Sequence, residues 1–119
     1  MRKLIIIFNP LLVILLSLVV AATASSAAPE NPEATSEIQF KNHHFVPGTI
    51  TVPSGRPIKI RVVNSSRETI EFESFSLNRE EAVEPGESIM VRLPALRPGK
   101  YDFFDDFHQD VPEGAIIDN

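Results

Sequence analysis

The chain has 119 residues, of which 43% are hydrophobic and 23% charged, and its formal net charge is −5. This length allows one domain and leaves little room for a second. The absence of cysteine excludes a disulfide scaffold, a thiolate metal site and a thiol nucleophile. Without Arg2 and Lys3 the net charge falls from −5 to −7, and so acidic a surface disfavours nucleic acid and anionic lipid as partners.

The first 24 residues have the three-part layout of a secretory signal peptide. A short basic start precedes the almost wholly apolar segment 4–20, and Ala22 and Ala24 then form an A-x-A cleavage pattern. The apolar run approaches the length of a membrane span, so an uncleaved anchor is the alternative. We expect cleavage, because small residues follow the run where an anchor usually carries charged or aromatic side chains. The mature protein is then periplasmic and not embedded in the membrane.

Residues 25–36 are rich in proline, alanine and glutamate and show no apolar periodicity, which predicts a flexible leader. The expected domain is residues 37–119. Within it, apolar side chains recur at every second position, the pattern of half-buried strands. This alternation is clearest in the segments 38–41, 58–62, 70–73, 89–93 and 101–103. Turn sequences rich in proline, glycine, asparagine and serine separate these segments, and no helical periodicity persists. Strands at this spacing predict an all-β fold, an antiparallel Greek-key β-sandwich of seven or eight strands.

Three strings resemble the bacterial cupredoxin-like domain. They are KNHHFVP at 41–47, ITVPSGRPI at 50–58 and LRPGKYDFF at 96–104. Two narrower strings, at 71–80 and 103–108, resemble the EfeO-type cupredoxin-like family, which is associated with periplasmic ferrous iron uptake. The resemblance implies an accessory protein that binds or relays iron. It also implies two partners, a membrane iron permease and a periplasmic iron-binding protein.

The residues at the ligand positions exclude a type-1 copper site. Such a site needs a cysteine thiolate, two histidines and usually a weak axial methionine. By the resemblance, Asp105 stands at the cysteine position and Ile70 at about the first histidine position, whereas His108 matches a ligand. No methionine follows His108. The chain is therefore not a blue-copper electron carrier.

Five residues are candidate metal ligands: His108, Asp106, Glu71, His43 and Glu80. The strand period of two predicts that Glu71 and Glu73 point to the same side. Convergence of the loops that carry the other candidates is implied by the resemblance. Carboxylates with imidazoles suit Fe(II), Mn(II) or Zn(II), and imidazole also attracts Cu(II). Iron is therefore the expected metal and copper(II) the alternative.

Most of these residues also have a structural interpretation. His108 could be an exposed loop histidine, and Asp106 could cap a turn. Glu71 and Glu73 could form the exposed face of an edge strand, the commonest fate of alternating acids.

Glu80 could pair with Arg79 instead of a metal. Strand alternation places His43 and His44 on opposite faces, and His43 fits the family string better. Asp105 is expected to be structural or exposed to solvent.

Three other functions compete with iron binding. One is a metal-free interaction module of a membrane transport complex, and another is a copper(II)-binding periplasmic protein. The enzymatic alternative is a ferroxidase, since the chain lacks the G-x-S-x-G, H-E-x-x-H and phosphate-loop motifs. Donor atoms of His108, Asp106 and Glu71 or Glu80 within about 5 Å of one another would favour a metal site. Donors on separate faces would favour a docking module.

Overall fold

A computed structural model describes residues 2–4, 22–24, 27 and 31–119. Its strands are β1 (Ala34–Lys41), β2 (His44–Val46), β3 (Thr49–Val52), β4 (Ile58–Asn64), β5 (Ile70–Ser74), β6 (Arg79–Val83), β7 (Ser88–Leu93), β8 (Gly99–Asp105) and β9 (Gly114–Asp118). The described residues contain no helix, and hence none long and apolar enough to cross a membrane. Most of the expected signal peptide, residues 1–24, and part of the expected leader lie outside the described residues.

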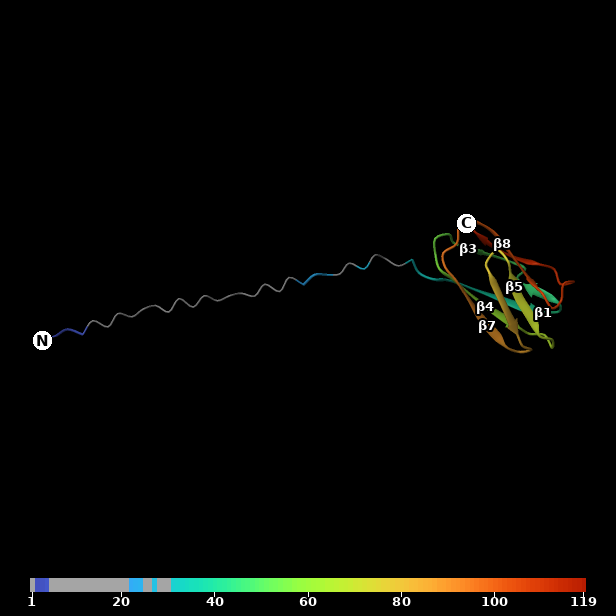
Figure 1. The fold of residues 1–119 in the computed structure, drawn as a ribbon, viewed down its shortest axis with the longest axis horizontal. Coiled ribbons are helices and arrows are strands. Elements are labelled where there is room, and N and C mark those ends of the chain that lie inside the picture. Colours follow the sequence, from blue (N-terminus) through green and yellow to red (C-terminus); the bar gives the residue numbers. More distant parts are fainter. Residues whose placement is uncertain (1, 5–21, 25–26, 28–30) are drawn as a thin grey trace.

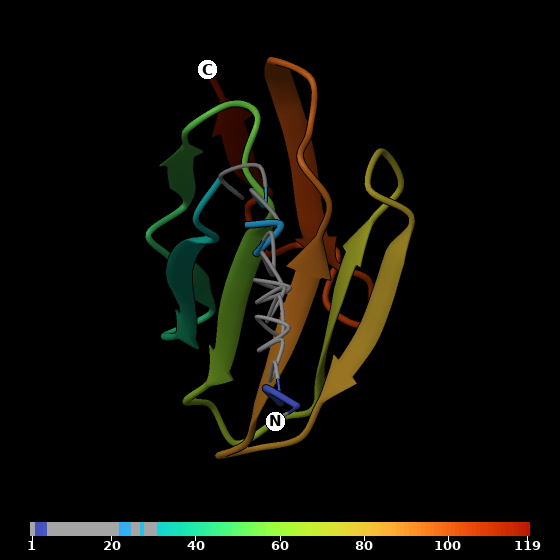
Figure 2. The same cartoon turned by 90° about the vertical axis from the view of Figure 1, so that its left-hand side faces the viewer.

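The strands form two packed sheets (Figures 1 and 2). One sheet has the order β2-β1-β4-β7 and the other the order β3-β9-β8-β5-β6. The predicted all-β sandwich is confirmed. The prediction of seven or eight antiparallel strands was wrong in detail, because the described residues form nine strands and two neighbouring pairs, β1–β4 and β3–β9, are parallel.

The extra strand arises where the chain crosses from one sheet to the other. β2 pairs with β1, whereas β3 pairs with β9 in the opposite sheet. Pro47 and Gly48 separate β2 from β3. Proline cannot donate a ladder hydrogen bond, so a single strand through this point is disfavoured.

The alternating side chains meet between the sheets as predicted. In β4, Ile58, Ile60 and Val62 are buried, and the intervening Lys59 is only partly covered. Phe103 of β8 lies at the centre of an aromatic group, with its ring 5.0 Å from that of Phe45 and 5.1 Å from that of Phe72.

β1 begins three residues before the expected domain boundary at Glu37. The Ala34 N–H donates to the carbonyl of Pro57 (2.8 Å), and the Asn31 side chain donates to the carbonyl of Gly55 (2.9 Å). Residues 34–36 therefore extend the parallel pairing with β4, although their side chains show no apolar alternation.

Gly114 provides a test of this packing. A Cβ at this position would clash with the Phe103 ring and lie 2.9 Å from the carbonyl oxygen of Gly48. We expect Gly114→Ala to lower the free energy of unfolding by about 2 kcal/mol or more, because the core must shift to admit one methyl group. Urea denaturation would measure the change. Gly99→Ala is the control, since its nearest neighbour lies 3.9 Å away, and an equal loss in both variants would contradict the packing.

Candidate functional site

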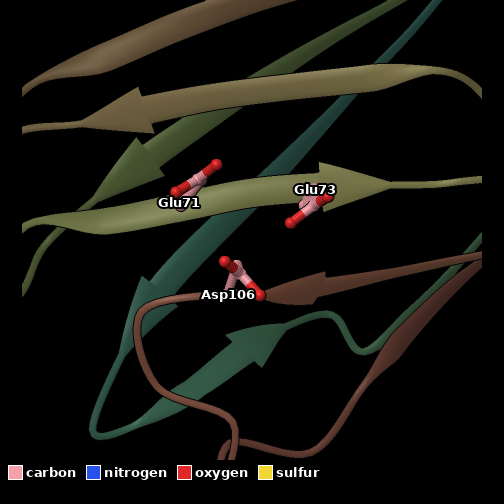
Figure 3. A group of neighbouring side chains, drawn as sticks. All are labelled: Glu71, Glu73 and Asp106. Carbon is pink, nitrogen blue, oxygen red and sulfur yellow. The ribbon is translucent and has the colours of Figure 1, made fainter.

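Three carboxylates gather on the outer face of the sheet that contains β5 and β8. Glu71 and Glu73 project from the same side of β5, and Asp106 directly follows β8 and faces them (Figure 3). One oxygen from each carboxylate lies within 4.8 Å of the others. The antiparallel register explains this arrangement, because Phe72 pairs with Asp105 and the Asp106 N–H reaches the Glu71 carbonyl (3.3 Å).

Glu80 joins this group from β6, where it pairs across the strands with Glu73. A hydrogen bond shared with the Glu80 carboxyl, reinforced by burial and by neighbouring negative charges, raises the pKa of Glu71 to about 7. Burial and the charges of Asp106 and Glu80 also raise the pKa of Glu73. We call these four residues the carboxylate cluster. At neutral pH it is a crowded group of negative charges that retains part of a proton.

His43 and His108 form a second group. Their ring centroids lie 6.0 Å apart in an edge-to-face arrangement. His43 Nε2 donates to Asp110 Oδ2 (2.8 Å), and this hydrogen bond lowers the pKa of Asp110. His108 Nε2 lies 3.2 Å from Glu68 Oε2. Both Nε2 atoms therefore face carboxylates that a metal would have to displace.

Asp105 lies between the two groups and is completely buried. Its Oδ1 accepts hydrogen bonds from the backbone N–H groups of Glu71 (2.9 Å) and Phe107 (3.1 Å). Its Oδ2 accepts a hydrogen bond from His108 Nδ1 (2.7 Å), and this bond raises the pKa of His108. Asp105 is thus a buried structural acceptor and is not exposed to solvent.

The structure divides the five candidate ligands between these groups. Glu71, Asp106 and Glu80 belong to the carboxylate cluster, whereas His43 and His108 belong to the histidine pair. Among the described residues, the group whose donor atoms all lie within 4.8 Å of one another consists of Glu71, Glu73 and Asp106. The sequence suggested that His108 would belong to this group, and the structure has Glu73 there instead.

Three structural interpretations of the sequence need correction. Glu71 is not on an exposed edge, since it is only 6% exposed and β5 lies between β8 and β6. Glu80 has Glu71 as its partner instead of Arg79, whose guanidinium donates to backbone carbonyls. His43 lies in the turn between β1 and β2 with a positive φ of 62°, so strand alternation does not decide its direction.

Sequence reasoning missed the acidic partners of the histidines. Glu68, which contacts His108, lies in the loop before β5, and Asp110, which contacts His43, lies in the loop after β8. Both acids are therefore distant in sequence from the histidines that they contact. No spacing signal in the sequence identifies such pairs. Glu73 carried a usable signal, because the strand period of two places it beside Glu71.

Replacing the buried carboxylate tests its link to His108. We expect Asp105→Asn to lower the pKa of His108, because the hydrogen-bonded negative charge is removed. A raised histidine pKa contributes stability that is present below the unfolded value and lost as pH rises through the folded value. The stability difference between wild type and variant should therefore shrink as pH rises above 6.5, the ordinary histidine pKa, and through the raised pKa of His108. NMR titration of the imidazoles and urea denaturation would measure both effects.

His44→Gln is the control for this experiment. The His44 side chain is exposed and bonds only the carbonyl of Asn42 among the described residues, so its loss should leave the His108 titration unchanged. An unchanged His108 pKa in Asp105→Asn would contradict the assigned contact.

Comparisons with known proteins identify the family. An uncharacterised protein of Rickettsia prowazekii (strain Madrid E) is 46% identical over 83 residues, which span 70% of this chain and 66% of that relative. The metal-binding domain of the Streptococcus pneumoniae D39 Cu(I)-exporting P-type ATPase has a similar fold, with a TM-score of 0.67 and 18% identity over 78% of this chain and 92% of that one. Auracyanin A, a blue copper protein of Chloroflexus aurantiacus, also has a similar fold, with a TM-score of 0.62 and 15% identity. The match covers 74% of this chain and 100% of auracyanin A. Residues 12–117 match the cupredoxin-like domain, and the chain belongs to this family, without the cysteine of a type-1 copper site.

Proposed function

We propose that this cupredoxin-like domain binds a divalent metal ion at the carboxylate cluster. The observation that carries the proposal is the approach of Glu71, Glu73 and Asp106 to within 4.8 Å, together with the raised pKa of Glu71. Crowded carboxylates repel one another, and a cation would relieve that repulsion and displace the retained proton. Oxygen donors suit hard cations such as Fe(II) or Mn(II) better than Cu(I).

Glu80 and Asp105 would support the ligands. The Glu80 carboxyl would exchange its shared proton for the bound cation, and Asp105 holds the backbone of Glu71 in place. Groups that orient ligands in this way strengthen a metal site without touching the ion. Asp106 is exposed, so the cluster is open to loading and release. These features suit an accessory that passes a metal on.

Iron is the metal that the EfeO-type resemblance favours. The physiological role that we propose rests on the same resemblance. The protein would be exported to the periplasm by its signal peptide and bind or relay ferrous iron there. Its partners would be a membrane iron permease and a periplasmic iron-binding protein. The carboxylate donor set is compatible with Fe(II) and does not select it over Mn(II).

The histidine pair supports copper(II) binding as a second candidate. Imidazole nitrogens are good Cu(II) ligands, and the rings of His43 and His108 lie 6.0 Å apart. Binding there would require displacement of Glu68 and Asp110, which face the Nε2 atoms. The carboxylate cluster needs no such displacement, and we therefore prefer it.

Calorimetric titration of the purified protein would separate the candidates. With Fe(II) under anoxia we expect one site per chain, weakened at least about tenfold by Glu71→Gln or Asp106→Asn. Glu81→Gln is the matched control, because Glu81 is exposed on the same hairpin outside the cluster. His108→Gln should leave Fe(II) binding nearly unchanged. Tight Cu(II) binding lost in His108→Gln would favour the histidine pair, and no binding of Fe(II), Cu(II) or Zn(II) would leave a metal-free interaction module.

The raised pKa of Glu71 also predicts a trade-off between stability and binding. An acid whose folded pKa lies above its unfolded value destabilises the fold increasingly as pH rises from about 4.5 to about 7. In chelator, Glu71→Gln should therefore gain stability relative to wild type from about pH 5 to about pH 8. Over the same range, metal affinity of the wild type should rise as the proton leaves. Urea denaturation and calorimetry would measure these trends, and a parallel stability profile in the two proteins would contradict the assigned pKa.

A further inference from the structure

A groove of about 540 Å³ lies beside the carboxylate cluster and shares Asp106 with it. Phe75 and Phe104 form its aromatic wall, with ring centroids 5.1 Å apart in an edge-to-face arrangement. Phe75 follows β5, Phe104 belongs to β8, and Val111 in the β8–β9 loop provides a further apolar side chain. We call this feature the aromatic groove.

The core does not explain the aromatic side chains of this groove. Phe75 is 79% exposed, while Leu77 is the residue of the same turn that packs into the core. Phe104 points away from the core because its neighbour Phe103 is completely buried. Large apolar side chains that gather in a concave surface are typical of an interaction site.

The rim of the groove is acidic. Asp102, Asp106 and Glu113 line it, and none of the described residues that line it is basic. Lys100 reaches Asp102 (3.3 Å), but both side chains are more than half exposed and such pairs contribute little. The groove therefore presents aromatic faces and carboxylates together.

The opposite sheet differs in charge. Lys59 and Arg61 of β4 alternate with its core residues and hence lie on the outer face, where Arg92 of β7 pairs across the strands with Lys59. These three cations are ion-paired with Glu33 or Glu37, whereas the carboxylates that line the aromatic groove have only Lys100 beside Asp102 as an ion-pair partner among the described residues. A partner attracted to the aromatic groove must itself be positively charged.

We propose that the aromatic groove binds a basic segment of a partner protein, with an arginine or lysine beside an apolar side chain. A guanidinium or ammonium group is attracted by aromatic faces and by carboxylates, and the groove offers both to one side chain. The adjacent apolar side chain would cover the exposed face of Phe75. The bound segment would lie next to Asp106 and so beside the proposed metal ligands. This inference goes beyond the proposed metal binding and does not require it.

NMR titration of the ¹⁵N-labelled protein in chelator would test the groove. The probe is the blocked peptide Ala-Arg-Leu-Arg-Ala, with Ala-Glu-Leu-Glu-Ala as the matched control. We expect amide shifts at Phe75, Ser76, Phe104 and residues 109–113 with the basic peptide alone. A dissociation constant on the order of 1 mM should weaken several-fold between about 0.05 and about 0.3 M salt, because exposed charges are screened.

Variants distinguish the groove from general attraction to an acidic protein. Phe75→Ser and Glu113→Gln should each weaken binding of the basic peptide by about threefold or more, consistent with a loss of at least 0.6 kcal/mol. Phe107→Ser is the control, because Phe107 is 52% exposed and does not line the groove. Equal responses to both peptides, or unchanged binding by Phe75→Ser, would overturn the proposal.

A second copy of the chain is the competing occupant. Amide shifts that depend on protein concentration in the absence of peptide would overturn the proposal and indicate self-association, if they occur both in the groove and at Lys59, Arg61 and Arg92. Because chelator is present throughout, the peptide result is independent of whether the carboxylate cluster binds a metal.

Discussion

The end of the sandwich that carries both candidate metal groups depends on one buried carboxylate. Asp105 is excluded from solvent, and a buried charge without partners would be strongly destabilising. Its three hydrogen bonds reach the β5 backbone at Glu71, the following loop at Phe107 and the imidazole of His108. These contacts fix where the loop leaves β8. They therefore place Asp106 beside β5 and His108 beside His43.

The same network separates two kinds of chemistry. A thiolate at this position could coordinate copper, whereas the Asp105 oxygens are already occupied by N–H donors from the protein. A cation would consequently find better ligands to one side, at the carboxylate cluster on the outer face. If the proposed metal site is correct, a hydrogen-bonded carboxylate at position 105 directs a cation to oxygen ligands on the outer face of the sheet.

Local patterns in the sequence predicted the strands well and their long-range pairing poorly. The two-residue period in segment 58–62 correctly predicted the buried face of β4, and the same period placed Glu71 beside Glu73. The parallel pairing of β1 with β4 left no local signal. Nor did the contact between His43 and Asp110, which are 67 residues apart. Such contacts follow from how loops meet at the ends of strands, which depends on the whole topology.

The burial of Glu71 is what distinguishes the carboxylate cluster from an ordinary solvated acidic surface. Exposed acids on a strand repel weakly because water screens them, and they titrate near their usual values. Glu71 is only 6% exposed, and a side-chain hydrogen bond with Glu80, together with burial, raises its pKa to about 7. An empty cluster of this kind destabilises the fold at neutral pH, and replacement of one acid by an amide would remove the strain. A cluster that costs stability is understandable if it binds a cation, and the exposed Phe75 in the turn after β5 likewise suggests function at the expense of stability.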